Sequence, residues 1–497
     1  MKKRILSLLL AALMLTQFTA CSEKTTGEDT SGGEDTSAVP GEETSESESE
    51  TNEYDALMAD VPTGNYDGYQ FMMLNNESNF AYTQMDADEQ TGEPIHDAIY
   101  NRNQAVANRL NIKIDENMVG YADVTTTMTN CIASEDDTYS CFWNEAYLIA
   151  PFAIGGQLLN INDISAIDLE KPWWDGDALD EIAFGDYQYF LVGDLHLMFK
   201  EAFFIMGFNK NILDANNLAE PYDMVREGTW TMDVMKSYME TVKVDLNGDG
   251  VMDGYDRFGM TTTGSCVAGF IIASDEVFIE RGEDGIPVLV QPSDRFYSVY
   301  EKIFGMTMDT SVDYSCIAGV TPNLSVYEDD FHGVFRSGNA LFYLEPIGSL
   351  KKFRDIEIEF GVLPTPKYDE SQEDYITYIT SFAALCGIPI TADAERTGVI
   401  LENLGAESFG ELRETYINDT LNFKYIRDEE SVEMLNLILD SGRFNLADIL
   451  SIGDPMNVII SSLLMRQIEL ASSYASIQEA TANQLAENVN KLMKVEQ

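Results

Sequence analysis

The chain has 497 residues and a formal net charge of −55, because 85 aspartate and glutamate residues outnumber 30 lysine and arginine residues. A negative charge of this size argues against binding of nucleic acid, against adhesion along an anionic lipid surface, and against strongly anionic small ligands. Hydrophobic residues make up 45% of the chain, and at this length we expect at least two domains or lobes.

The amino terminus has the pattern of a lipoprotein export signal. A basic start at residues 2–4 precedes the apolar run 5–15, which is too short to span a bilayer. Small residues at positions 19 and 20 stand directly before Cys21. We therefore expect residues 1–20 to be a signal peptide and Cys21 to carry acyl chains such as palmitate, which anchor the protein outside the cytoplasm. An ordinary signal peptide with a chance cysteine is the alternative.

Residues 21–60 are dominated by serine, threonine, glycine, glutamate and aspartate. Such a segment cannot bury enough apolar surface to offset the entropy lost on ordering, and its like charges extend it. We expect a disordered acidic tether.

The globular part begins with alternating strand and helix patterns. Residues 69–74, 111–114 and 140–143 read as strands, while 95–110 and 124–131 read as helices. This alternation predicts a largely parallel sheet with helices on its faces. Ligands of such sheets bind beyond the carboxyl ends of the strands, so the loops after the first and third strands are candidate binding loops. Later, 277–290 reads as a hairpin, and 457–471 and 477–493 read as helices.

The cysteines and histidines do not form a recognisable metal or disulfide pattern. Five cysteines follow Cys21, and the histidines at 96, 196 and 332 are isolated, so we expect no zinc site. A bridge between Cys131 and Cys141 and buried free thiols both remain open.

Residues 245–256 have the spacing of a twelve-residue EF-hand loop, with Gly250 at the sixth position, where the turn needs glycine. A helix pattern precedes the loop, whereas a strand pattern follows it. The spacing predicts a structural calcium site, and an Asp/Gly-rich turn without metal is the alternative. The expected ligands are Asp245, Asn247, Asp249, Asp253 and Asp256, together with the carbonyl of Val251.

Several segments, taken in order, resemble the family 1 extracellular solute-binding proteins, the receptors of sugar-type ABC importers, akin to maltose-binding protein. These segments are 142–145 with 155–161, 199–202 with 208–213, 228–231, 338–342 and 360–366. The resemblance covers the chain from about residue 65 to the end.

The resemblance implies a two-lobed α/β fold of the periplasmic-binding-protein type (type II), with the lobes joined by crossing hinge strands. Residues 61–198 and 382–450 would form lobe 1. Residues 199–381 and 451–497 would form lobe 2, which includes the calcium loop.

The resemblance also implies that aromatic faces and planar polar groups bind a sugar between the lobes. Trp143 is the main stacking candidate, Trp173 and Trp174 form either a second platform or lobe packing, and Trp230 is expected in the core. The ligand-binding residues that we expect are Trp143, Asn144, Glu145, Glu201, Trp173, Trp174, Asn75, Glu77, Tyr343 and Glu345.

The function implied is capture of a carbohydrate, an oligosaccharide above all, and its delivery to the membrane permease of an ABC importer. We expect a monomer without enzyme activity that contacts the membrane only through its lipid. A secreted glycoside hydrolase is the main alternative, because its two carboxylates cannot be excluded among so many acidic residues. A cell-surface adhesion module is a further alternative. No GxSxG, HExxH, P-loop or GxGxxG motif indicates another chemistry.

Overall fold

The computed structural model describes residues 54, 56–78, 82–282, 285–309, 311–315, 330–418, 428–450, 452, 458–459, 462 and 470–494. The chain divides at Glu53 into two units, and the fold belongs to the second, Tyr54–Gln497. The expected signal peptide, Cys21 and most of the expected tether lie outside the described residues. Within the described part, no helix combines the length and the apolar character needed to cross a membrane.

The first sheet, which defines lobe 1, has the strand order β12–β3–β1–β2. Its strands are β1 (Tyr69–Glu77), β2 (Ile112–Gly120), β3 (Cys141–Glu145) and β12 (Ala384–Gly387). β1 runs parallel to β2 and β3, whereas β12 is antiparallel to β3. The alternation seen in the sequence is confirmed, because α3 (Pro94–Leu110) connects β1 to β2 and α4 (Tyr121–Ala133) connects β2 to β3.

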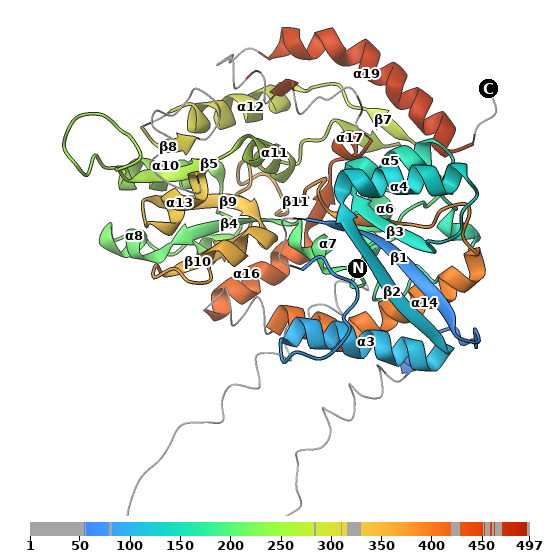
Figure 1. Ribbon diagram of the computed structural model, residues 1–497. Helices are drawn as coiled ribbons and strands as arrows, with labels where there is room; N and C mark the ends of the chain where they lie inside the picture. The colour runs from blue at the N-terminus through green and yellow to red at the C-terminus, as the bar shows by residue number, and fades with distance from the viewer. Residues whose placement is uncertain are drawn as a thin grey trace, which may run out of the picture. The chain divides into compact units, whose positions relative to one another are not determined.

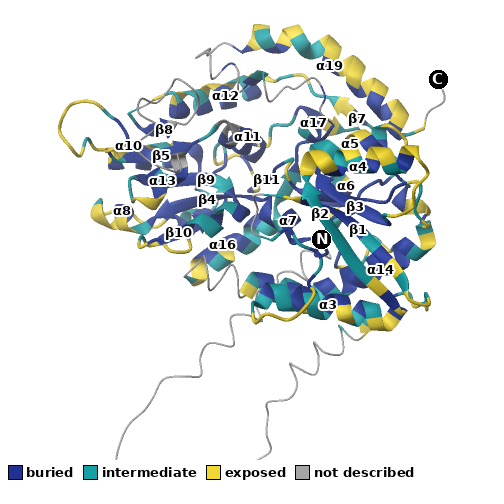
Figure 2. Cartoon of the chain, viewed as in Figure 1, coloured by how far each residue is buried: buried dark blue, intermediate teal, exposed yellow. Residues whose placement is uncertain are grey.

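The second sheet, which defines lobe 2, has the order β10–β4–β9–β5–β8. Its strands are β4 (Phe204–Asn209), β5 (Phe258–Thr262), β8 (Asp313–Ser315), β9 (Ala340–Pro346) and β10 (Phe360–Leu363). β5 is parallel to β8 and β9, while β4 is antiparallel to β9 and β10. Figure 2 shows buried residues along most strands of both sheets, intermediate burial along β2, and exposed residues on the outer faces of α4 and α19 (Ala471–Leu492).

Two chain crossings fix how the sheets face each other. Helix α7 (Leu197–Glu201) leads from lobe 1 into the amino end of β4, and β11 (Thr377–Ile379) leads back toward the amino end of β12. Because β9 and β3 run antiparallel to these entering strands, their carboxyl ends lie at the crossings. The carboxyl ends of β1, β2 and β3 therefore turn toward lobe 2, and those of β5, β8 and β9 toward lobe 1. The expected two-lobed fold with crossing strands is confirmed.

Helix α16 (Glu429–Asp440) packs on lobe 2, so the expected assignment of 382–450 to lobe 1 is wrong there. Its apolar face, Met434, Leu435 and Ile438, is buried. At its start, the Ser431 hydroxyl accepts a hydrogen bond from the Val362 amide of β10 at 3.1 Å. Apolar residues spaced three or four positions apart show that the helix has a buried face, but they do not show which sheet covers it.

Helix α19 (Ala471–Leu492) contacts both lobes, although 451–497 was expected to belong to lobe 2. Near its start, the Tyr474 ring lies 6.0 Å from that of Phe278 in lobe 2. At its end, the carbonyl of Leu492 accepts a hydrogen bond from the Tyr189 hydroxyl of lobe 1. Figure 1 shows the helix running from above α12 (Asp294–Thr307) to above α5 (Ala146–Ile154).

Other elements follow the sequence pattern. β6 (Ile279–Arg281) and β7 (Pro287–Leu289) form the expected hairpin, and most of the expected helix 457–471 lies outside the described residues. Trp230 is fully buried, as expected, and its indole nitrogen donates to the Pro364 carbonyl at 3.1 Å.

Substitution of two glycines by alanine can distinguish the effect of tight packing in a strand from the effect of intrinsic helix preference. A Cβ on Gly361 of β10 would lie 2.1 Å from the Tyr222 hydroxyl, whereas one on Gly305, which is exposed in α12 (Asp294–Thr307), would contact nothing within 4 Å. Gly361→Ala should therefore lower the free energy of unfolding by about 2 kcal/mol or more, and Gly305→Ala should raise it by about 0.5–1 kcal/mol. Urea unfolding of the two variants measures both changes. Equal effects would contradict the packing of β10 on Tyr222.

Candidate functional site

Three aromatic side chains line the carboxyl edge of lobe 1; we call Tyr121, Tyr147 and Phe382 the aromatic edge. Tyr121 directly follows β2, Tyr147 lies two residues after β3, and Phe382 lies two residues before β12. Tyr121 is 50% exposed and Phe382 is 44% exposed, whereas most other large rings in the described residues are buried. The rings of Tyr147 and Phe382 are 6.1 Å apart and nearly perpendicular. The sequence reasoning missed all three, although each stands beside a strand end.

Glu145 ends β3 beneath the aromatic edge and is only 7% exposed. Burial raises the pKa of its carboxyl group, while a hydrogen bond from the Tyr147 hydroxyl opposes that rise. In turn, burial and the charge of Glu145 raise the pKa of Tyr147. The expected ligand residue Glu145 therefore lies at the edge that faces lobe 2.

Asn144 holds the start of α4 in place. Its amide nitrogen donates to the Tyr121 carbonyl at 3.1 Å and to the Thr125 hydroxyl at 3.2 Å, and its oxygen accepts from the Glu145 amide. Because Asn144 is fully buried, it positions Tyr121 and Glu145 rather than presenting its own side chain to solvent.

Trp143 is 1% exposed, and its ring lies 5.9 Å from that of His196 inside lobe 1. An indole so covered has no open face on which a sugar ring could stack. The stacking role expected for Trp143 stays a prediction, which this burial does not favour.

Trp173 and Trp174 also lie in the core of lobe 1. The Trp174 indole nitrogen donates to Glu402 at 3.0 Å, and a Cβ on Gly405 would lie 2.7 Å from the Trp173 ring. Both contacts are with α14 (Ala394–Glu407), so the arrangement matches the lobe-packing alternative. Burial raises the pKa of Glu402 to about 7.

Asn75 and His196 tie β1 to the crossing helix α7. The Asn75 amide donates to Glu116 at 2.6 Å, and its oxygen lies 3.3 Å from His196 Nε2. His196 Nδ1 accepts from the Met198 amide at the start of α7. Burial and the nearby charge of Arg102 lower the pKa of His196 to about 3, so the ring is neutral. The structure therefore gives Asn75 a positioning role.

The remaining expected residue of β1, Glu77, is exposed at the strand's carboxyl end. It lies in the same sheet edge as the aromatic residues, because β1 stands between β3 and β2.

Glu201 lies where the two lobes meet. It is 2% exposed at the end of α7, and its carboxylate accepts from the Tyr82 amide of lobe 1 at 3.2 Å. Its charge also stabilises the charged form of Lys351, which lies in η3 (Ile347–Phe353) of lobe 2, although burial lowers the pKa of Lys351 overall.

Glu345, at the carboxyl end of β9, is the counterpart on lobe 2. Its oxygens accept from the hydroxyls of Thr263 at 3.4 Å and Ser349 at 3.3 Å. Burial raises its pKa to about 7, and the nearby Lys352 charge opposes the rise. Tyr343, by contrast, is fully buried and packs 4.9 Å from the Phe353 ring, so it belongs to the core.

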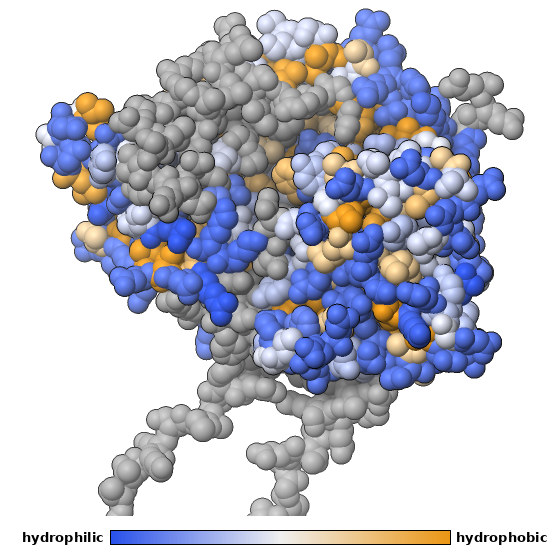
Figure 3. Space-filling model, in the orientation of Figure 1, coloured by the Kyte–Doolittle hydropathy of each residue, from blue (hydrophilic) through white to orange (hydrophobic). Residues whose placement is uncertain are grey.

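The predicted calcium loop projects from lobe 2 between α10 (Met232–Val242) and β5 (Figure 1). Backbone bonds between Val244 and Arg257 close its base, and Asp245, Asn247 and Asp249 accept amide hydrogens within the loop. Leu246 and Val251 are exposed, and Figure 3 shows apolar patches beside hydrophilic surface there.

The described residues contain no group of three or more His, Cys, Asp or Glu side chains arranged to hold a metal ion. Asn247 and the Val251 carbonyl are oxygen ligands of other kinds. The expected set of Asp245, Asn247, Asp249, Val251, Asp253 and Asp256 stays a prediction.

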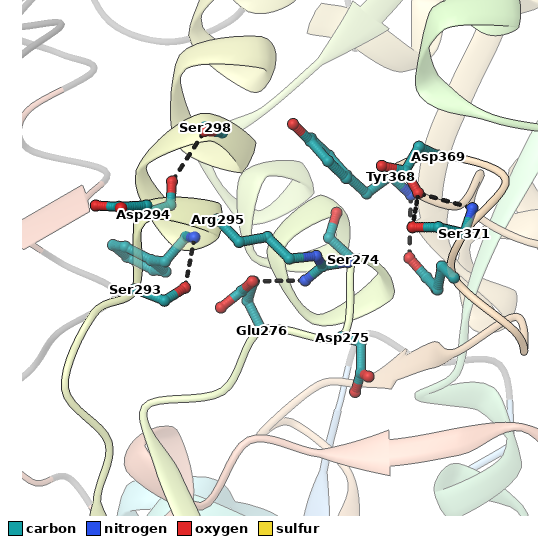
Figure 4. Close-up of polar contacts among 12 residues, drawn as sticks. Ser274, Asp275, Glu276, Ser293, Asp294, Arg295, Ser298, Tyr368, Asp369 and Ser371 are labelled. Carbon is teal, nitrogen blue, oxygen red and sulfur yellow. Dashed lines mark hydrogen bonds and ion pairs between the residues drawn. The ribbon is translucent and has the colours of Figure 1, made fainter.

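Two further groups of side chains stabilise the fold and lie outside the candidate site. The four described cysteines are free thiols. Cys141 lies against Cys386 of β12 rather than against Cys131, so the bridge considered between Cys131 and Cys141 is wrong. In lobe 2, Arg295 pairs with Glu276 and lies 5.2 Å from the centre of the Tyr368 ring (Figure 4).

No protein-family model matches the chain, and no curated protein matches it. Solved structures do match. UgpB from Mycobacterium tuberculosis in complex with glycerophosphocholine matches with a TM-score of 0.56 and 11% identity, over 85% of this chain and all of that one. A cyclo/maltodextrin-binding protein complexed with maltotetraose matches with a TM-score of 0.54 and 12% identity, over 86% of this chain and 97% of that one. The ABC substrate-binding protein Lmo0181 from Listeria monocytogenes in complex with cycloalternan matches with a TM-score of 0.52 and 14% identity, over 86% of this chain and 100% of that one. These likenesses establish a shared two-lobed α/β fold.

The raised pKa of Glu402 makes stability depend on pH. Because its folded pKa, about 7, exceeds its ordinary value of 4.5, its contribution is full below pH 4.5 and is lost as pH rises through 7. Glu402→Gln keeps an acceptor for Trp174 but no charge. It should leave the free energy of unfolding unchanged at about pH 5 and raise it by on the order of 2 kcal/mol at about pH 8.

Urea unfolding at the two pH values tests this expectation, with the same substitution at the exposed Glu373 as the control. An equal effect of Glu402→Gln at both pH values would contradict it.

Proposed function

We propose that the protein is the substrate-binding lipoprotein of an ABC importer, a family 1 extracellular solute-binding protein that captures a carbohydrate between its lobes and delivers it to the membrane permease. One observation carries the proposal: two sheets turn their carboxyl edges toward each other, and one edge exposes aromatic rings above a carboxyl group. Ligands of α/β sheets bind at such edges.

The chemistry of the two edges suits a sugar. The apolar face of a pyranose stacks on aromatic rings, and its hydroxyls hydrogen-bond to planar polar groups. Phe382 and Tyr147 supply rings on lobe 1, while Glu345 and Thr263 supply polar groups on lobe 2. Two of the matching structures hold oligosaccharides, maltotetraose and cycloalternan, which supports the same ligand class for this chain.

The proposed location rests on the sequence. The expected export signal and lipidation at Cys21 support a location outside the cytoplasm, and the acidic segment behind the anchor would let the lobes reach a permease. We propose a monomer that touches the membrane only through its lipid.

A glycoside hydrolase is the second candidate, because its chemistry needs two carboxyl groups about 5–10 Å apart. Glu145 and Glu345 are carboxyl groups at facing edges, so a test for turnover belongs with every binding measurement. The shared fold is that of binding proteins in the structures named above, and we therefore favour capture without reaction.

Removing the rings of the aromatic edge should weaken capture. Phe382→Ala and Tyr147→Ala each remove a stacking face, and each should raise the Kd for a bound oligosaccharide by about tenfold. Ile390→Ala is the matched control, since Ile390 is 49% exposed beyond the other end of β12. Calorimetry against a panel of oligosaccharides, with product analysis, measures both binding and turnover. Unchanged affinity in both ring variants, or hydrolysis of a glycoside, would refute the assignment.

We also propose that residues 245–256 bind calcium as a structural ion. Outside the cell a Kd of about 10⁻⁴–10⁻³ M suffices, and bound calcium raises the melting temperature by mass action. The conservative change Asp249→Asn keeps an oxygen for the turn but removes a charge, so it should reduce the calcium-dependent shift. Asp214→Asn, an exposed aspartate elsewhere in lobe 2, is the control. The same calcium-dependent rise in melting temperature in Asp249→Asn, or no rise in the unmodified protein, would contradict the site.

A further inference from the structure

We infer that the captured saccharide carries a protonated amine, as an amino sugar does, and that its ammonium group binds Glu145 within the aromatic edge. The inference rests on the proposed function, because it names the ligand class of the same site. It is drawn from the charge and ring arrangement around one carboxyl group.

Glu145 is a buried carboxyl group without a cation of its own. Its side chain is 7% exposed and accepts a hydrogen bond from the Tyr147 hydroxyl. No lysine or arginine among the described residues pairs with it or lowers its pKa. Burial of an ionised carboxylate without a counter-charge is costly, so a cation that enters the edge would gain a strong partner.

Two other buried or half-buried carboxylates near the facing edges, Glu345 and Glu201, interact with lysine residues of the protein. Glu345 lies near Lys352 and accepts from two hydroxyls, and Glu201 acts on Lys351. Within the described part of the chain, Glu145 is thus a buried carboxylate of this site on which no lysine or arginine acts, and it lies on the lobe 1 side, where the aromatic rings are.

The rings around Glu145 suit the same group. Aromatic faces carry a partial negative charge and attract ammonium ions, most strongly where water is excluded. Tyr147 and Phe382 meet at 83° and form a corner, and Tyr121 continues the edge along the sheet. One sugar unit of the ligand can thus stack on an aromatic ring and bind the Glu145 carboxylate through its ammonium group at the same time.

The charge of the whole chain works in the same direction. With a net charge of −55, the protein attracts cations over long range and repels acidic saccharides. A neutral sugar keeps the stacking contact and can donate hydroxyl hydrogen bonds to Glu145, but it lacks the attraction between opposite charges.

Three saccharides of matched length and linkage test the inference: an oligomer of glucosamine, its fully N-acetylated form, and the corresponding glucose oligomer. Binding is measured by calorimetry at about pH 6, where the amine is protonated. The unmodified protein should bind the glucosamine oligomer at least about tenfold more tightly than either neutral oligomer. This comparison needs no variant and so does not depend on folding of a mutant.

Two variants then test whether Glu145 causes the preference for the charged oligomer. Glu145→Gln should reduce the affinity ratio between the charged and neutral oligomers to about one, while Glu170→Gln, an exposed carboxylate on lobe 1, should leave the ratio unchanged. A thermal melt verifies that each variant is folded.

The failures are distinguishable. Equal or tighter binding of the neutral oligomers overturns the amine inference and leaves carbohydrate capture standing. Binding of none of the saccharides, nor of any in the wider panel, overturns both. A preference for the amine that survives in folded Glu145→Gln shows that another residue binds it, which also overturns the assignment.

Discussion

The antiparallel pairing of the two entering strands is the constraint on which the site depends. β4 and β12 each begin at a crossing between the lobes, and each pairs in antiparallel fashion with a strand of its sheet. That pairing turns the carboxyl ends of the other strands toward the opposite lobe. Had either entering strand been parallel to its neighbour, the carboxyl edge of that lobe would have pointed away from the other lobe, and no site could form between the two carboxyl edges.

Buried polar groups at these edges divide into two kinds. The side chains of Asn75, Asn144 and His196 form hydrogen bonds with other groups of the protein, and these bonds hold β1, α4 and α7 in fixed positions. Glu145 has few internal partners and lies under exposed rings. The first kind makes the edge rigid, since unsatisfied buried groups would be costly. The second kind leaves interaction energy for a ligand.

The sequence pattern was most informative where the chain is regular. The alternation of strand and helix patterns from residue 69 to 143 predicted the parallel sheet, and two apolar runs on either side of an Asp-Gly pair in 277–290 predicted the hairpin. The expected tryptophans were less informative. Large aromatic residues are suited both to sugar stacking and to core packing, and Trp143, Trp173 and Trp174 fill the core of lobe 1. Composition alone cannot separate these roles, because burial depends on which other segments cover the ring.

By itself the sequence determined the α/β class, the acidic character and the spacing of the loop at 245–256, because these follow from composition, periodicity and local order along the chain. The resemblance to a known family added the expectation that Glu145 and Glu345 lie at strand ends. Tertiary structure decided the rest. Tyr121, Tyr147 and Phe382 come from segments up to 261 residues apart and meet only because β2, β3 and β12 share one sheet. The same holds for α16, whose apolar face fits β10. Contacts between distant segments depend on strand pairing and packing, which no local pattern of residues records.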